Sequence, residues 1–517
     1  MSISSPPPRV VRRRIVAWSL YDWANSSFAT TVMAAILPVY YSKVAAVTLD
    51  AAQATQYWSL GLSLSLLLTA LLAPVLGVVS DLSRCKKAFL AAFASLGIVA
   101  TGALFFVEEG DWLLASLVFV VARVGFASAN VFYDSLLPHV APPHLRDRVS
   151  ARGYALGYLG GGLLLGINIG MLGIFPATLG PRLCFVSVAL WWGAFSLPLL
   201  LAVPEPHTEA ASVGSWGQVI ATSFRRLGST LREVRQQRQL FAFLCAFFVY
   251  NDGIGTIIGV ATIYGAELGF GTMELVLALL LVQLVGIPFT LLFGRLPGGG
   301  GPLGGPLLFF VLYNIAALPL AGGVLARVWP ASVVGGGAAH GSALGSIIGA
   351  LVAVEVIGVV AAFFGGRVMA SAARRLTTKG ALLLTLLGYG VVATWGFFLR
   401  TVIEFWFLAW LVAVVQGGSQ ALSRSLYATL TPPERSGAFF GLFGVMQKFS
   451  AILGPALFAL AAGIFGSSRP AILGLVLFFG LGAWLLWRVD VAAGVRALQG
   501  GLAPSDPYGR EDASQVR

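Results

Sequence analysis

The feature that most constrains the fold is a series of apolar stretches that recurs along the 517-residue chain. Each stretch has about 20 residues, enough for a helix to cross roughly 30 Å of hydrocarbon. Hydrophobic residues form 57% of the chain and charged residues only 10%, whereas a soluble protein has about 25% charged residues. The short alternating segments of a membrane β-barrel are absent. The sequence therefore predicts an all-α, polytopic membrane protein.

The apolar stretches predict about 14 transmembrane helices. We place them at residues 16–42, 57–80, 88–107, 112–137, 153–174, 183–203, 239–265, 273–296, 306–327, 344–368, 379–399, 403–428, 437–465 and 469–488.

The distribution of basic residues predicts the orientation. Most of the 33 Lys and Arg residues fall in alternate loops, and the other loops contain only Lys43, Arg182, Arg327, Arg400 and Arg469. Basic loops stay in the cytoplasm, so we expect a multi-pass protein of the cytoplasmic membrane with both termini inside. The net charge of +12 then reflects topology and does not indicate a nucleic-acid partner.

The sequence offers no set of residues for enzymatic chemistry. All four histidines fall in predicted loops, and the three cysteines lack metal-ligand or redox spacing. The glycine-rich stretch "GYALGYLGGG" has no preceding strand and no P-loop lysine. We therefore expect neither an enzyme nor a metal or other cofactor.

The chain divides into two similar halves. Residues 1–203 form a six-helix half, 204–238 a cytoplasmic linker with a basic helix, 239–488 the second half and 489–517 a polar cytoplasmic tail. "LYDWANSSFAT" resembles "VYNDGIGTIIG", and the loop around Pro142 resembles the loop around Pro432. The second pair is about 60 residues further apart than the first, roughly two spans. This predicts an extra helical hairpin within about 297–370, without identifying which two helices form it.

Two aspartates fall inside predicted spans at matching places in the halves. A carboxylate at bilayer depth costs about 2.5–3.5 kcal/mol and normally faces a wet cavity or a partner. Asp22 and Asn25 share one helix face, and Asp252 has Asn251 beside it. We expect each aspartate to face either a hydrated cavity or a partner. The alternative for each is a cap on a broken helix or a pair with a buried arginine.

Four further polar residues within the spans are candidates for the same site. Arg123 would anchor a substrate carboxylate or act on an acidic partner, and its structural alternative is an ion pair with Asp134. Arg424 lies nearer the inner end, where the side chain would alternatively snorkel. Asn130 and Gln420 would hydrogen-bond a polar solute or, alternatively, a neighbouring helix.

The loop after the second predicted helix carries a family signature. "GVVSDLSRCKK", with Gly77, Asp81, Arg84, Lys86 and Lys87, resembles the inner-loop motif of the major facilitator superfamily, although Cys85 stands where that motif usually has glycine. The resemblance implies that these charges gate the inner side by pairing with neighbouring helices.

A more specific resemblance covers roughly residues 12–490, apart from the hairpin. "WSLYDWANSSFAT", "FYDSLLPHVAPPHLRDRVSARGYALGYLGGGLL", "VYNDGIGT" and "VVQGGSQALSRSLYATLTP" together resemble the autophagy-related vacuolar effluxer-like branch of that superfamily and its bacterial relatives. It implies a major facilitator fold of two six-helix halves, with the extra hairpin in the second. It also implies alternating-access transport of a small polar solute, with amino acids and efflux favoured.

In that fold the first and seventh helices line a central cavity, so the resemblance implies that Asp22 and Asp252 face it from opposite sides. We expect them to be the proton- or cation-binding groups of the transport cycle, and we expect a monomer. The alternatives are a non-transporting membrane sensor or scaffold on the same fold and a lipid translocase.

Overall fold

The structure is a computed structural model. It describes residues 8–83, 85–206, 232–268, 270, 272–299, 301–329, 340–450, 453–465, 467 and 469–500. Within these ranges the chain forms helices joined by short loops and contains no strand. The predicted linker falls mostly outside the described residues, as do Arg84 and the end of the tail.

The first half begins with one long continuous rod. It starts as α1 (Pro8–Ser27) and continues through η1 (Phe28–Ile36), α2 (Leu37–Tyr40) and η2 (Tyr41–Ala45), of which η1 and η2 are π-helical. The other long helices of this half are α3 (Ala51–Ser83), α4 (Lys86–Ala103), α5 (Trp112–Ser135), α7 (Arg146–Ile174) and α8 (Leu179–Ala202).

The second half repeats this plan with additions. Its helices are α10 (Arg238–Glu267), α11 (Thr272–Phe293), α12 (Gly304–Val328), α14 (His340–Arg375), α15 (Thr378–Phe398), α16 (Val402–Thr429), α17 (Ser436–Phe449), α18 (Leu453–Phe465), α19 (Arg469–Trp487) and α20 (Val491–Gly500). Short helical turns connect them: η3 (Leu104–Phe106), α6 (Leu137–Val140), η4 (Pro143–Leu145), η5 (Pro297–Gly299), η6 (Gly301–Leu303) and η7 (Pro433–Arg435).

Twelve of the described helical segments are long and apolar enough to cross a bilayer. Two spans of the sequence prediction are not among them. The predicted span 273–296 corresponds to α11, whose apolar part is Leu277–Phe293. The predicted span 437–465 corresponds to two helices, α17, which ends at Phe449, and α18, which begins at Leu453.

The packing of the halves shows which helices correspond. α11 packs against α7 and α16, as α3 packs against α17 and α5. α15 packs against α16 and α19, as α4 packs against α5 and α8. This correspondence leaves α12 and α14 without counterparts, and these two pack chiefly against each other. We therefore assign the inserted hairpin to α12 and α14.

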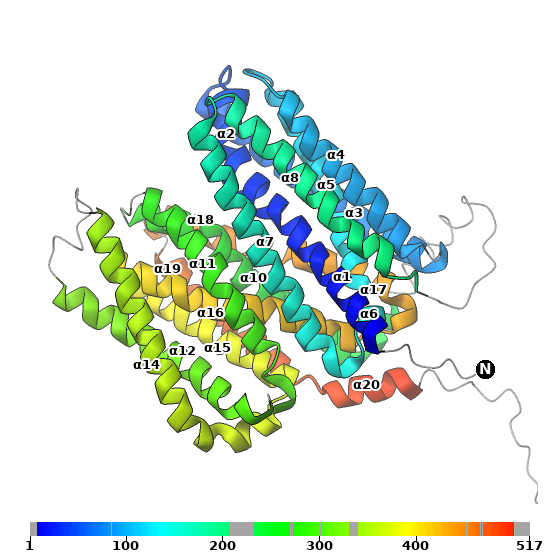
Figure 1. The fold of residues 1–517 in the computed structure, drawn as a ribbon, viewed down its shortest axis with the longest axis vertical. Coiled ribbons are helices and arrows are strands. Elements are labelled where there is room, and N and C mark those ends of the chain that lie inside the picture. The colour runs from blue at the N-terminus through cyan, green and yellow to red at the C-terminus, as the bar shows by residue number, and fades with distance from the viewer. Residues whose placement is uncertain are drawn as a thin grey trace, which may run out of the picture.

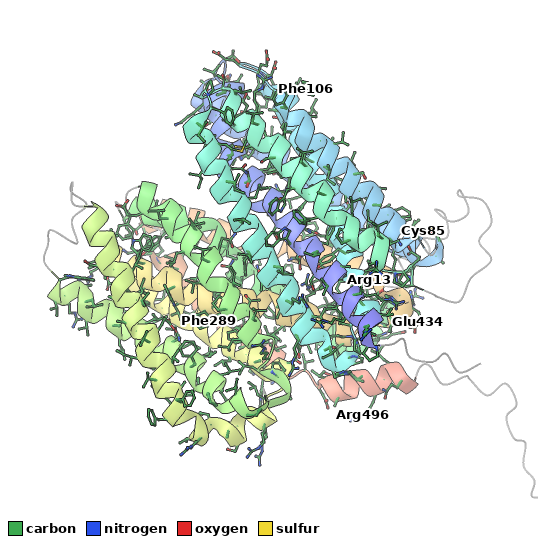
Figure 2. All side chains as sticks on the ribbon, in the orientation of Figure 1. Arg13, Cys85, Phe106, Phe289, Glu434 and Arg496 are labelled. Carbon is green, nitrogen blue, oxygen red and sulfur yellow. The ribbon has the colours of Figure 1, made fainter. Side chains whose placement is uncertain are left out.

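The ends of the long helices define two faces of the molecule. The start of α1, the turn α6 and the surface helix α20 lie at one end, here called the terminal face (Figure 1). The opposite end, here called the distal face, carries the loop residues 46–50, 107–111 and 399–401. In Figure 2, Arg13, Cys85, Glu434 and Arg496 lie toward the terminal face, and Phe106 lies at the distal face.

Candidate functional site: a cavity above an arginine cluster

A cavity of about 1010 Å³ lies between the two halves. Its lining reaches Lys43 and Leu399, which stand at the distal face. Toward the terminal face the lining ends at Ser26 on α1, Tyr154 on α7 and Gln420 on α16. The space is therefore open toward the distal face and closed toward the terminal face.

The closed end is formed around Arg424 of α16. Arg424 Nη2 donates to Asp22 Oδ2 at 3.1 Å, and Nη1 donates to Asp134 Oδ1 at 3.0 Å. Nε donates to Ser150 Oγ at 2.9 Å, and Nη2 also donates to the Ser150 carbonyl at 2.9 Å. One guanidinium of the second half thus binds α1, α5 and α7 of the first.

Aromatic rings enclose the same guanidinium. Its central carbon lies 4.2 Å from the ring centre of Tyr154, 4.9 Å from that of Trp18 and 5.5 Å from that of Tyr133. Tyr133 also donates its hydroxyl to Asp22 Oδ2 at 2.8 Å. Ring faces attract cations most strongly where water is excluded, and the Arg424 side chain is only 3% exposed. The snorkelling interpretation of Arg424 is therefore wrong in this conformation.

A glycine makes room for this cluster. A Cβ atom added at Gly153 of α7 would lie 2.9 Å from Arg424 Nη2 and would also contact the Asp22 carboxylate. Any side chain at this position would push the arginine away from its partners. The close approach of α7 to α1 therefore depends on glycine here.

The three candidate amides next to the cluster join helices. Asn25 Nδ2 donates to Asn130 Oδ1 at 2.6 Å, connecting α1 to α5. Tyr158 donates its hydroxyl to Gln420 Oε1 at 3.0 Å, connecting α7 to α16. Of these four residues, Tyr158 and Gln420 also line the cavity.

Asp252 occupies a different environment from Asp22. Its Oδ1 accepts a hydrogen bond of 3.0 Å from the backbone N–H of Gly454, in the first turn of α18. The neighbouring Asn251 donates to Ser450 Oγ at 2.6 Å, just before the break between α17 and α18. Neither Asp22 nor Asp252 lines the cavity, so the expectation that both face it from opposite sides is not met in this conformation.

Arg123 lies apart from the Arg424 cluster. The expected alternative partner, Asp134, pairs with Arg424 instead. Arg123 Nη1 is buried without a hydrogen-bond partner in the described part of the chain. Lys448 of α17 interacts electrostatically with both Arg123 and Asp134.

The inner-loop motif connects the halves at the terminal face. Lys86 forms an ion pair of 2.9 Å with Asp81 and donates to Ser436 Oγ at 2.7 Å. Asp81 accepts from the backbone N–H groups of Gly437 at 3.0 Å and Ala438 at 2.7 Å, at the start of α17. A carboxylate at a helix N-terminus is favoured by the helix dipole. These contacts hold the second half against the first.

The other motif residues take supporting positions. The backbone of Gly77 packs so tightly against that of Gly437 that a Cβ atom would not fit. Lys87 Nζ donates to the Val203 carbonyl at 3.0 Å, and the Lys87 N–H donates to Glu205 Oε2 at 3.0 Å. Lys87 therefore ties the loop to the end of its own half, whereas Asp81 and Lys86 reach the other half.

Sequence reasoning did not assign Asp134 a site role of its own or place Ser150 and Tyr154 in the site. A signal for Asp134 exists, because Tyr133–Asp134 repeats the Tyr21–Asp22 pair. Ser150 and Tyr154 carry no comparable signal, since only the packing of α7 against α16 brings them to Arg424.

Comparison with known proteins identifies relatives along most of the chain. The family model described as vacuole effluxer Atg22 like matches residues 51–297 and 340–499. An uncharacterized MFS-type transporter, YxiO of Bacillus subtilis, is 33% identical, over 91% of this chain and 93% of its own length. Autophagy-related protein 22-1 of Penicillium rubens is 23% identical, over 84% and 75%. The solved proton:xylose symporter XylE superposes with a TM-score of 0.60 at 13% identity, over 95% of this chain and 99% of its own.

Proposed function

From the premise that this chain belongs to the Atg22-like vacuole effluxer family of major facilitator transporters, we propose that it is a proton-coupled secondary transporter. It moves a small organic solute across the membrane by alternating access. The cavity is the solute site, and the Arg424 cluster is the gate between that site and the terminal face. The single observation that supports this most is the bridge from Arg424 to Asp22 and Asp134, because it joins the two halves at the closed end.

Alternating access requires this bridge to break and re-form. In the present conformation the halves meet at Arg424 and at the Asp81–Lys86 contacts with α17. Opening the terminal face separates Arg424 from both aspartates. A buried ion pair that loses one partner is strongly destabilised, so the open state needs another way to neutralise the carboxylates.

Protons supply that neutralisation. The cluster places two carboxylates within ion-pair distance of one guanidinium. When that guanidinium moves away, a bound proton removes the cost of a buried, unpaired carboxylate. The other titratable groups around it are Tyr133, Tyr154 and, beside Asp134, Lys448. Protonation of Asp22 or Asp134 weakens its bond to Arg424 and favours separation of the halves.

The charge pattern supports the orientation that we propose, and the family description supports the direction. The basic loops favour a cytoplasmic terminal face, which makes the present conformation outward-facing. We propose efflux, as the family description states for its members. The sequence resemblance alone favours amino acids, which are therefore the first solutes to screen, whereas the apolar lining of the cavity favours a less polar solute.

The test uses protein reconstituted in proteoliposomes, with a solute chosen by ligand-induced thermal stabilisation at two pH values. Solute movement is measured with and without a pH gradient for the native chain, Asp22→Asn and Asp134→Asn. We expect the pH gradient to drive transport in the native chain and at least one asparagine variant to lose that dependence. Unchanged transport and unchanged pH dependence in both variants would refute proton coupling through this cluster.

A further inference from the structure

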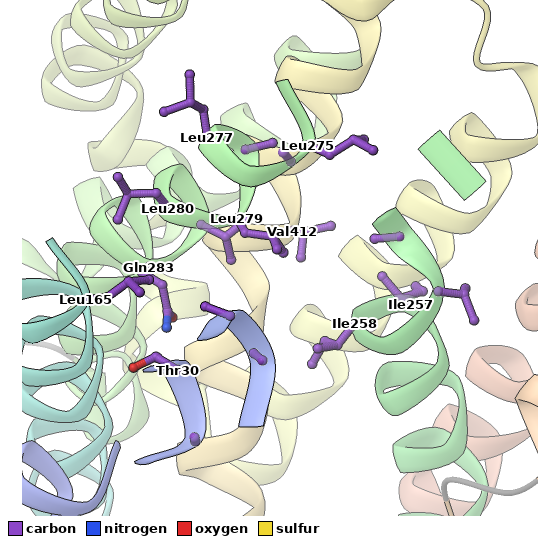
Figure 3. Close-up of a pocket in the computed structure, with 18 of the residues that line it drawn as sticks. Thr30, Leu165, Ile257, Ile258, Leu275, Leu277, Leu279, Leu280, Gln283 and Val412 are labelled. Atoms are coloured by element: carbon purple, nitrogen blue, oxygen red, sulfur yellow. The ribbon is translucent and has the colours of Figure 1, made fainter. Parts of the chain in front are cut away.

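The cavity lining has an unusual distribution of polarity. Most of its side chains are aliphatic, and Figure 3 shows leucine, isoleucine and valine residues of α7, α10, α11 and α16 around the space, with Thr30 and Gln283 among them. Among the described residues of the lining, Lys43 is the only charged one, and it belongs to the distal end of the first rod. The body of the cavity therefore contains no ionic partner for a solute.

Most hydrogen-bonding side chains of the lining lie at its deep end; toward the distal face, the hydroxyls of Tyr40 and Tyr264 already donate to backbone carbonyls. Along each of four helices, the lining residue nearest the terminal face is polar: Ser26 on α1, Tyr154 on α7, Gln283 on α11 and Gln420 on α16. Moving toward the distal face, α16 continues with Gln416 and then Val412, Ala409 and Leu408. The cavity thus has a polar floor and apolar walls.

The charged side chains below the floor are already paired with one another and are not available to pair with a bound solute. Arg424 is already paired with Asp22 and Asp134, and the Tyr154 ring lies over its guanidinium. What the floor offers is neutral: amides and hydroxyls. An unpaired charge placed among aliphatic walls is expensive, so a zwitterion is poorly accommodated.

Resting on the proposed function, we infer that the transported solute is a bulky, uncharged amphipathic molecule. Its apolar body occupies the walls formed by α10, α11 and α16, and a neutral hydrogen-bonding end, such as an amide, meets the floor. The volume supports this size, because pockets of about 300–1000 Å³ hold drug-sized ligands. Small polar amino acids would leave most of the apolar lining without contact.

Four dipeptide probes test separately how apolar side chains and terminal charges of a ligand affect its binding. They are N-acetyl-leucyl-leucine amide, N-acetyl-seryl-serine amide, free leucyl-leucine and free seryl-serine. Binding is measured by ligand titration of the unfolding temperature in lipid nanodiscs, which avoids competition by detergent. We expect the blocked leucine probe to bind at least about tenfold more tightly than the blocked serine probe, because its apolar side chains are buried. We expect a similar preference for it over free leucyl-leucine.

Variants locate the binding to the cavity. Val412→Thr keeps the shape of the wall but adds a hydroxyl, and we expect it to weaken the blocked leucine probe roughly fivefold. The control is Val352→Thr on the lipid-facing side of α14, where Val352 is 48% exposed, and it should leave binding unchanged. The native chain should prefer the blocked leucine probe, which ends in an amide, over N-acetyl-leucyl-leucine methyl ester, which does not. Gln420→Leu should remove this preference.

The outcomes distinguish this inference from the proposed function. Tighter binding of a free or serine probe, or equal binding of all four, or no binding of any, overturns the inference. Loss of binding in Val352→Thr equal to that in Val412→Thr also overturns it, because it would indicate lipid or surface binding. Proton coupling through Asp22 and Asp134 is measured separately, so its failure with intact probe binding overturns only the proposed function.

Discussion

Asp22 and Asp252 stand at matching places in the two halves, yet their surroundings differ completely. Asp22 accepts from Arg424 and Tyr133 and connects the halves. Asp252 accepts from the N–H of Gly454 and stays within its own half. Asp22 therefore bridges the two halves, at the position where we propose a gate, whereas Asp252 contacts the start of a helix.

The difference has its origin in the helices opposite the two aspartates. Opposite Asp22, α7 is one continuous helix without a proline. Opposite Asp252, α17 ends at Phe449 and α18 begins at Leu453, with Pro455 in its first turn. Proline has no backbone N–H, and the first N–H groups of a helix need an acceptor from outside it. Asp252 accepts from one of them, the N–H of Gly454, so the helix opposite each aspartate accounts for its different partner.

The largest expected effect comes from removing the arginine of the first site. Arg424→Met leaves Asp22 and Asp134 buried without their cation, which costs about 3–5 kcal/mol. We expect a much lower unfolding temperature in nanodiscs. Adding Asp22→Asn and Asp134→Asn should restore most of the loss, since the excess buried charge is then gone.

A matched arginine at the distal face provides the control. Arg182 forms an ion pair of 3.3 Å with Glu108, whose side chain is 68% exposed. Arg182→Met should cost about 1 kcal/mol or less, because exposed pairs contribute little. If Arg424→Met destabilised no more than this control, the cluster would not be the principal bridge between the halves.

An intermediate effect is expected from filling the space beside the arginine. Gly153→Ala places a methyl group against Arg424 Nη2 and the Asp22 carboxylate. Overpacking of this kind costs about 1–3 kcal/mol. Gly166→Ala on the same helix has nothing within 4 Å and should be neutral or slightly stabilising. Equal unfolding temperatures for the two variants would show that α7 can move away without losing the cluster.

The fold was largely predictable because its signals are local. The length of each apolar stretch predicts a membrane span. The similar sequences around Asp22 and Asp252, and around Pro142 and Pro432, predict two related halves. The predicted span 437–465 is an exception with a physical reason. In the structure α17 ends at Phe449 and α18 begins at Leu453, and the contact of Asp252 with the start of α18 is not part of a hydropathy pattern.

The site was predictable in its residues but not in its pairings. Sequence reasoning selected Asp22, Arg424 and Asn25 because polar residues are costly in a bilayer. For Arg123 it offered a pair with Asp134 of the same helix only as the alternative to a site role, whereas Asp134 bonds Arg424 of the other half. Pairings across the halves depend on helix packing, and no spacing along the chain encodes them.

The smallest expected effect tests the second aspartate. Asp252→Ala removes the cap of α18 and should cost about 1 kcal/mol, whereas Asp252→Asn keeps a side-chain oxygen for the Gly454 N–H and should cost less. If Asp252 acts only as a cap, transport and its pH dependence remain in Asp252→Asn and change in Asp22→Asn. Because asparagine accepts hydrogen bonds but cannot take up a transported proton, this comparison separates a cap from a carrier. Loss of pH-driven transport in Asp252→Asn, at an unfolding temperature equal to that of the native chain, would give both aspartates a part in proton movement and end the distinction drawn between them.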